Sequence, residues 1–237
     1  MTPGEHHRPS LSQEGTSVST STIAHGSRRP HGTGHRLLTY LAGCLVFSSG
    51  SYLFIYSDLG TDPLDVFALG LLKHVQLTVG VAQALIAALC ILVWAAWYRR
   101  RPVVLPFVTF FLCGSVIDLL RLTDPGRFLP LPHVVLMLLA TTLCAYASSL
   151  IIMSGVGIRA MDLVALAIVD KWGWPFWAAK MSMEGILLGC GYLMGGPVGV
   201  GTVCFLVVVD TMIQPFMRAN ARVLRIPNLG MPSLEKP

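Results

Sequence analysis

Two stretches of the chain decide the fold. They read YLFIYSDLGTDPLDVFALGL over Tyr52–Leu71 and SLIIMSGVGIRAMDLVALAI over Ser149–Ile168. At a constant offset of 97 residues, seven of the twenty aligned positions are identical, where chance in apolar sequence gives roughly one or two. The shared residues are Leu53, Ile55, Ser57, Gly60, Asp65, Ala68 and Leu69, which recur as Leu150, Ile152, Ser154, Gly157, Asp162, Ala165 and Leu166. Self-similarity at a fixed offset marks repeated structural units, so the sequence predicts two related halves.

The composition is that of a membrane protein. Of 237 residues, 54% are hydrophobic and only 12% are charged, and the mean hydropathy is +0.66. Soluble domains carry about 25% charged residues, which excludes an ordinary soluble domain. The net charge of +5 does not indicate a nucleic-acid partner, because the basic residues lie between apolar runs. We therefore expect a polytopic helical protein whose surroundings are the lipid bilayer.

Six apolar runs have about the length that crosses a membrane. A hydrocarbon core of about 30 Å needs about 20 helical residues. The runs are Leu37–Tyr56, Val79–Tyr98, Pro102–Leu120, Val134–Met153, Phe176–Leu193 and Val198–Met217. The fifth contains Lys180 and Glu184 and is the weakest of the six. The sequence thus predicts an all-α bundle of six transmembrane helices.

The spans group into two halves flanked by tails. Residues 1–35 are rich in Ser, Thr, Gly and His, which predicts a disordered tail that lacks the apolar core of a signal peptide. The first span would then act as an uncleaved anchor. Three spans follow in residues 36–121 and three more in residues 131–217, and residues 218–237 form a C-terminal tail.

The basic residues predict the orientation of the chain. With six spans both termini lie on one side, and Lys73, Arg121 and Arg127 fall on the other, which leaves 14 of the 17 Lys and Arg residues on the side of the termini. Positive residues accumulate on the cytoplasmic side. We expect a multi-pass protein of the plasma (cell inner) membrane with both tails cytoplasmic.

Because each half has three spans, the halves must enter the membrane in opposite directions. Each also contains an apolar helix too short to cross, at Pro63–Leu72 and at Ala160–Val169. These helices could be re-entrant or interfacial. Inverted repeats of this kind recur in secondary transporters, which place their site near the middle of the bilayer.

Asp65 and Asp162 occupy the same position in the two halves and have two interpretations. Asp62 and Pro63 form a good helix start, so an acidic residue in the first turn can simply stabilise the helix dipole. Gly60 and Gly157 would then serve the tight turn before each short helix. Alternatively, both aspartates contact a solute or ion at the repeat interface. The sequence leaves both interpretations open.

Other charged residues lie within or beside the spans. Lys180 and Glu184 are four residues apart and can neutralise each other on one helix face. Asp210 has no charged neighbour in its own span, so we expect it to face the bundle interior, with Arg159 or Lys180 as its partner. Asp210 and Arg159 are therefore further candidates for solute or ion contact, beside a structural role.

Signatures of enzymes and metal sites are absent from the sequence. It contains no nucleophile elbow, zinc-protease motif or phosphate-binding loop. Its six cysteines show no metal-ligand spacing and are expected to be packing residues. We expect no catalytic activity, no cofactor and no metal site.

Three short elements resemble the YczE/YitT-type bacterial integral membrane proteins. They are Leu59, Gly60, Pro63, Asp65 and Val66 after the first span; Gly155, Gly157 and Asp162; and the turn of Gly195, Gly196, Gly199, Gly201 and Thr202. The similarity covers roughly residues 36–217. The sequence departs from the family's usual pattern in two places. One is Arg159-Ala160-Met161, just before Asp162, and the other is Asp210, which occupies a position that is commonly small. The resemblance implies a bacterial plasma membrane protein and no particular activity.

The sequence favours transport of a small solute or ion through a site between the two halves. The alternative is a non-transporting scaffold or accessory protein that docks through small residues. Gly43 and Gly50 could form that face, as could Gly185 and Gly189, and a homodimer is one form such docking could take.

Overall fold

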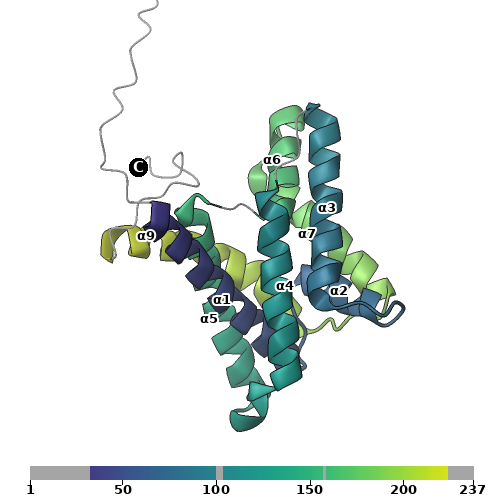
Figure 1. Cartoon of the computed structure of the whole chain (residues 1–237), viewed down its shortest axis with the longest axis vertical. Helices are drawn as coiled ribbons and strands as arrows, with labels where there is room; N and C mark the ends of the chain where they lie inside the picture. The colour runs from purple at the N-terminus through teal and green to yellow at the C-terminus, as the bar shows by residue number, and fades with distance from the viewer. Residues whose placement is uncertain (1–32, 100–103, 157–158, 224–237) are drawn as a thin grey trace, which may run out of the picture. The chain divides into compact units, whose positions relative to one another are not determined.

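The computed structural model describes residues 33–99, 104–156 and 159–223. All regular elements in these residues are helices (Figure 1). They are α1 (Thr33–Ser57), α2 (Pro63–Leu72), α3 (Val79–Tyr98), α4 (Leu105–Thr123), the short 3₁₀ helix η1 (Pro125–Phe128), α5 (His133–Ser154), α6 (Ala160–Trp172), α7 (Phe176–Leu193), α8 (Val200–Cys204), the π-helical turn η2 (Phe205–Val209) and α9 (Asp210–Val223).

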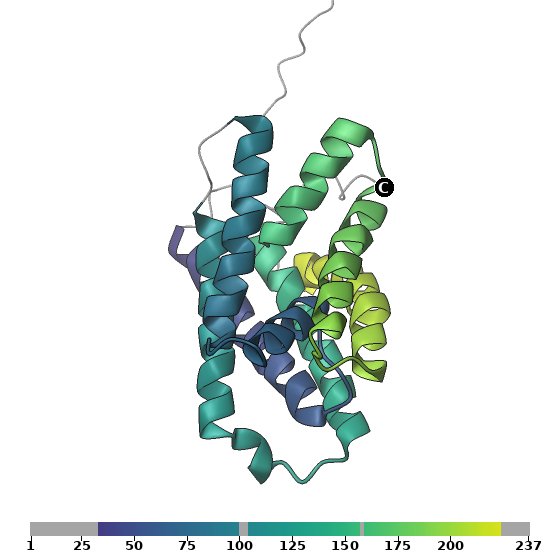
Figure 2. The ribbon, with the colours of Figure 1, turned by 90° about the vertical axis from the view of Figure 1, so that its right-hand side faces the viewer.

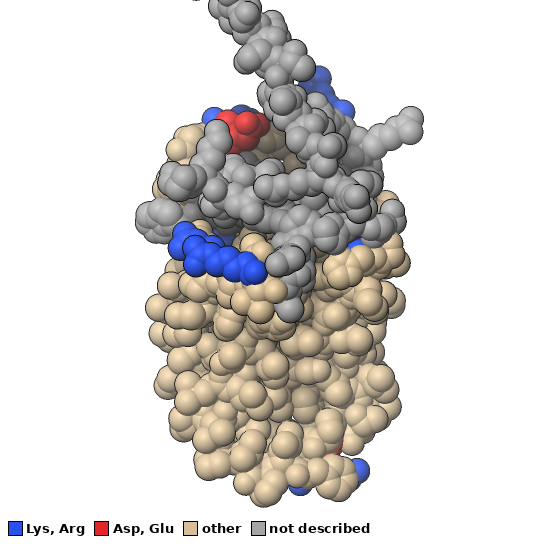
Figure 3. Space-filling view, turned by 90° about the vertical axis from the view of Figure 1, so that its left-hand side faces the viewer, with Lys and Arg blue, Asp and Glu red and all other residues tan. Residues whose placement is uncertain are grey.

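Five helical segments are long and apolar enough to cross a membrane. They are Gly34–Ser57, Val79–Tyr98, Leu105–Thr123, His133–Ser154 and Val200–Val223, the last made of α8, η2 and α9. The helix α7, predicted as the fifth of six spans, is present with the expected bounds but is not among them. On the face shown in Figure 3, the charged side chains lie toward the two ends, and the broad area between them has none. Such a surface suits contact with lipid.

Helices extend into both predicted tails. The first helix begins at Thr33, within the tail predicted to end at residue 35. At the other end α9 continues to Val223, past the predicted boundary at residue 217. The rest of both tails lies outside the described residues, as does Gly157.

The packing of α1 against α5 places the two halves of the chain together (Figure 1). A Cβ atom on Gly43 would lie 3.3 Å from the carbonyl oxygen of Ala147, and one on Gly50 would lie 3.3 Å from that of Ala140. Residues 43 and 140 are 97 apart, as are 50 and 147. The two contacts are therefore reciprocal across the repeat offset.

The ends of α1 and α5 make a second reciprocal pair of contacts. Arg36 at the start of α1 donates from Nε to the Ser154 carbonyl oxygen at the end of α5, at 3.1 Å. His133 at the start of α5 donates from Nδ1 to the Ser57 carbonyl oxygen at the end of α1, at 2.6 Å. Residues 36 and 133 are 97 apart, as are 57 and 154. Each contact supplies a donor to carbonyl groups that a helix end leaves without an intrahelical partner.

The short helices α2 and α6 are held between long ones in the same reciprocal way. The helix α2 packs on α7 and α3, and α6 packs on α3 and α7. Figure 2 shows α2 lying across the space between α3 and α7. The turn before α2 needs a glycine, because Gly60 has a φ of 101°, a conformation that other residues rarely adopt. The carbonyl oxygen of the preceding Leu59 accepts a hydrogen bond from the Gly201 amide (2.7 Å), which ties this turn to α8.

A glycine of α7 lies against the backbone of α2, which gives a testable prediction. A Cβ atom on Gly191 would lie 2.6 Å from the backbone nitrogen of Phe67 and 2.7 Å from its Cα atom. Because these are backbone atoms, Gly191→Ala must push the helices apart and should destabilise the protein by about 1–3 kcal/mol. Gly189→Ala on the same helix meets nothing within 4 Å and should leave stability unchanged or raise it by up to about 1 kcal/mol.

Thermal unfolding of both variants in detergent measures this difference. Equal melting temperatures for Gly191→Ala and Gly189→Ala would contradict the close packing of α2 on α7.

Candidate functional site

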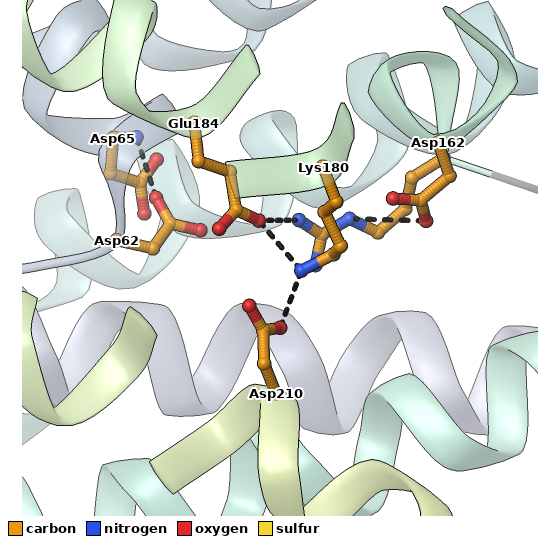
Figure 4. A network of polar contacts seen from close by, with 7 residues as sticks. Asp62, Asp65, Asp162, Lys180, Glu184 and Asp210 are labelled. Atoms are coloured by element: carbon orange, nitrogen blue, oxygen red, sulfur yellow. Dashed lines mark hydrogen bonds and ion pairs between the residues drawn. The ribbon is translucent and has the colours of Figure 1, made fainter. Parts of the chain in front are cut away.

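Seven charged residues meet between the two halves of the chain, and we call them the central charged cluster. Its members are Asp62, Asp65, Arg159, Asp162, Lys180, Glu184 and Asp210, all but Arg159 labelled in Figure 4. The side chains come from the N-terminal ends of α2 and α6, from α7 and from the start of α9. Five are buried, and the Lys180 and Asp210 side chains are 12% and 19% exposed.

Asp62 and Asp65 occupy the start of α2. Asp62 has extended backbone geometry and accepts a hydrogen bond from the Asp65 amide through Oδ1, at 2.6 Å. Asp62 is therefore the N-cap of α2, and Pro63 is the first helical residue, as the sequence predicts. Asp65 does not cap the helix with its side chain. Its Oδ1 atom accepts a hydrogen bond from Nε2 of Gln83 in α3, at 2.6 Å.

Burial acts on both carboxyl groups of this segment, which lies between the first two long helices. It raises the pKa of Asp65 well above the ordinary value, and the neighbouring Asp62 carboxylate raises it further. Burial also raises the pKa of Asp62, although the Asp65 amide opposes that shift by donating a hydrogen bond. Asp65 accepts no backbone amide, and although the Gln83 side-chain amide opposes the rise in its pKa, Asp65 is the more perturbed of the two.

Arg159 and Asp162 occupy the start of α6. Nε of Arg159 lies 4.0 Å from Oδ2 of Asp162, and Nη2 of Arg159 lies 3.6 Å from Oε1 of Glu184. The Arg159 guanidinium also lies over the Phe47 ring of α1, 5.7 Å from its centroid, which favours a cation. Arg159 is therefore in contact with α1, α6 and α7.

Lys180 connects α7 to the last long segment. Its Nζ atom lies 2.7 Å from Oε1 of Glu184 and 2.5 Å from Oδ1 of Asp210 (Figure 4). The expected Lys180–Glu184 pair is thus present, and Lys180 is the partner of Asp210. The π-helical turn Phe205–Val209 ends just before Asp210. A π turn changes the direction in which the following residues face and is frequent at functional sites.

The cluster brings together all four candidate residues, Asp65, Asp162, Asp210 and Arg159, although they do not all touch. Lys180 and Glu184, expected only to neutralise each other, are central members. The sequence analysis missed Gln83. Two signals could have found it, because Gln83 is the one side-chain amide in α3 and precedes Lys180 by 97 residues. The same offset relates Asp62 to Arg159 and Asp65 to Asp162, so three polar positions of one half recur in the other.

The cluster does not have the form of a metal site. In residues 33–99, 104–156 and 159–223, no group of three or more His, Cys, Asp or Glu side chains could hold a metal ion.

A carboxylate elsewhere shows the contrast with Asp65. Both oxygens of Asp118 in α4 accept backbone hydrogen bonds at the start of α3, from Val79 and Gly80 at 2.8 Å each. Asp118 thus has a structural role that accounts for both of its oxygens.

Removing Lys180, the cation shared by Glu184 and Asp210, should destabilise the folded protein. Lys180→Met keeps most of the side-chain volume but leaves Glu184 with the more distant Arg159 and Asp210 without a cation. Breaking a buried ion pair costs about 3–5 kcal/mol, because an uncompensated charge stays buried. Adding Asp210→Asn to Lys180→Met should restore part of the loss, since it removes that charge.

Thermal unfolding of the single and double variants in detergent measures this coupling. Lys73→Met is the matched control, because Lys73 is exposed at its contact with the Gly195 carbonyl oxygen. The shared-cation arrangement is contradicted if Lys180→Met unfolds at the temperature of this control.

Comparisons with known proteins agree with a membrane fold. Over 176 residues the chain is 27% identical to the "Uncharacterized membrane protein YczE" of Bacillus subtilis (strain 168). The aligned region covers 74% of this chain and 82% of the relative. It is 26% identical over 185 residues to the "Uncharacterized protein YyaS" of the same organism, covering 77% and 92%. A third relative, an uncharacterised protein of Haemophilus influenzae, is 24% identical over 187 residues. No solved structure matches the chain.

The family model covers the helical part of the chain. Residues 34–218 match the family of unknown function DUF6198, a stretch that runs from the start of α1 into α9. The resemblance to YczE-like proteins that the glycine and aspartate motifs predicted is confirmed. The chain is a membrane protein with several apolar helices, and it belongs to the DUF6198 family.

Proposed function

We propose that the protein transports a small solute or ion through a site formed by the central charged cluster. The observation that carries this proposal is that both halves contribute buried charges to one place. Charges within a membrane are costly and are kept where they act on substrates, ions or protons. Elements from both halves also build the sites of transporters with inverted repeats, in which the starts of short helices face the substrate. The N-terminal ends of α2 and α6 hold four of the seven charges here.

The architecture that goes with this function has six spans in two inverted repeats. Here α7 crosses the membrane in addition to the five long segments and is the fifth span in chain order. The reciprocal contacts of α1 with α5, and of α2 and α6 with α7 and α3, support it. At 18 residues, α7 is about 27 Å long, close to the thickness of a hydrocarbon core. Its two charged side chains are turned into the cluster rather than toward lipid. Six spans also place both termini together, and the distribution of Lys and Arg favours the cytoplasmic side of the inner membrane.

A scaffold or accessory role is the second candidate, and one observation favours it. Gly185 and Gly189 are exposed on α7, and a Cβ atom on either would meet nothing within 4 Å. Small residues at this spacing let a second transmembrane helix approach closely. A homodimer through this face of α7 is compatible with either function.

Access of water to the cluster separates the two candidates. Single cysteines replace Asp65, Asp162 or Asp210 in a protein without its six native cysteines, and a membrane-impermeant maleimide is applied to sealed right-side-out and inverted vesicles. Transport predicts that at least one position reacts from both sides, because a site with alternating access opens to each side in turn. Asp210, the most exposed of the acids in the cluster, should react most readily.

Two control positions show how a residue exposed to water on one side and a residue exposed to lipid react with the maleimide. A cysteine at exposed Leu122, close to the end of α4, should react from one side only. A cysteine at Leu89, exposed near the middle of α3, should stay inert because lipid surrounds it. If all three cluster positions stay inert from both sides in folded protein, the transport proposal fails and the scaffold role is favoured.

A further inference from the structure

The charges of the central cluster do not balance. Five carboxyl groups face only two cations, and the cations are already engaged. Arg159 is near Asp162 and Glu184, and Lys180 contacts Glu184 and Asp210. An ionised cluster would therefore bury three negative charges in excess, and charges buried away from water without compensation are strongly destabilising. A group in such a position either binds a cation or takes up a proton.

Some oxygens of the cluster have no hydrogen-bond partner. They include Oδ2 of Asp65 and Oε2 of Glu184, on residues that are 0% and 1% exposed. In Figure 4 the second oxygen of Glu184 points away from Lys180, toward the side where Asp62 and Asp65 lie. Buried polar atoms are normally paired, so an orphaned carboxyl oxygen indicates a missing hydrogen or ligand. No grouping of these oxygens could hold a metal ion in the described part of the chain.

Among the described residues, no cation contacts Asp62 or Asp65, but only Asp62 is acted on by the charges of Arg159 and Lys180 and accepts a backbone amide. On α2 itself Asp65 is next to the acidic Asp62, and from α3 it receives only the Gln83 amide. Ser51 of α1 also faces it, and the exposed Arg121 of α4 acts on it only through its charge. Glu184 and Lys180 lie on α7, which packs against α2. Their ion pairs are with each other and with Asp210 and Arg159, and Arg159 is also near Asp162. Arg159 and Lys180 are therefore each nearer to another carboxylate than to Asp65.

We propose that Asp65 is a proton-binding site: its carboxyl group is protonated in the resting protein and releases that proton when a solute is transported. The coupling to transport rests on the proposed function, but the protonation does not. In the protonated state Oδ1 accepts from Gln83, and Oδ2 carries the proton, with the facing Ser51 hydroxyl, itself without a hydrogen-bond partner, available to accept a hydrogen bond from it. On release the Oδ2–H bond breaks, the electron pair stays on the carboxylate, and the proton passes to water that enters with the solute.

Infrared spectroscopy of the reconstituted protein tests the protonation without any solute. A protonated carboxyl group absorbs apart from a carboxylate, so the wild type should show a carboxylic acid band at neutral pH. Labelling aspartate with ¹³C at its side-chain carboxyl should shift this band. An unshifted band would arise from Glu184, the one glutamate between residues 15 and 234, and would overturn the assignment.

Three variants make the assignment specific. Asp65→Asn should remove the band, whereas Asp58→Asn should keep it, because Asp58 is exposed and its φ of 54° suits asparagine. Should Asp65→Asn fail to fold, Gln83→Leu still tests the site, because loss of the amide donor should shift the band without abolishing it. No acid band in the wild type, or the same band in Asp65→Asn, would overturn the proposal. So would an unshifted band in Gln83→Leu.

Stability should depend on pH in the direction that a buried acid requires. The folded protein holds the proton up to a higher pH than the unfolded chain, so stability should fall as pH rises from the ordinary aspartate pKa through the raised value. The melting temperature of the wild type and of Asp58→Asn should show this fall, and that of Asp65→Asn should show much less of it. Equal slopes for the two variants would contradict a protonated Asp65.

The test separates the two proposals. If the acid band is present but no cluster position is reached by water from both sides, transport fails and the proton site stands. If water reaches the cluster from both sides but the acid band is absent, the proton site fails and transport stands.

Discussion

The structure depends on keeping seven charged groups away from lipid. Lys180 is shared by Glu184 and Asp210, and Arg159 is close to Asp162 and Glu184. These contacts join α6, α7 and α9 at one place, and no single helix could shield the charges alone. Because a buried ion pair repays its desolvation only with good geometry, the helices around it have to pack closely. The glycines of α1, α2 and α7 permit that approach.

The same packing explains why the two halves are not interchangeable. Positions related by the offset of 97 residues make reciprocal contacts between α1 and α5, but at the cluster their chemistry differs. Asp62 corresponds to Arg159, and Gln83 corresponds to Lys180. One half therefore contributes carboxyl groups and an amide, and the other contributes both cations and three acids. A symmetric framework thus surrounds an asymmetric site. That asymmetry leaves Asp65 without a cation, whereas its counterpart Asp162 has Arg159.

Much of the fold could be predicted from local sequence. The bounds of α2, α3 and α7 agree with the predicted segments, because run length, Pro63 and the charged ends of the apolar runs are local signals. The last span is the exception. It appears as α8, a π turn and α9, and no local signal predicted that break. The N-cap role of Asp62 was also predicted, since capping depends only on residues within one turn.

By itself the sequence determined that this is a helical membrane protein with a repeated element and charges that need enclosure. Composition, run length and a constant offset are properties of the chain alone. Only the tertiary structure decided which charges meet. Whether Asp210 paired with Arg159 or with Lys180, and which side chain contacts Asp65, depended on how helices far apart in sequence cross. Those crossings are set by close contacts such as that of Gly191 with Phe67, which involve two distant segments and leave no signature in either one.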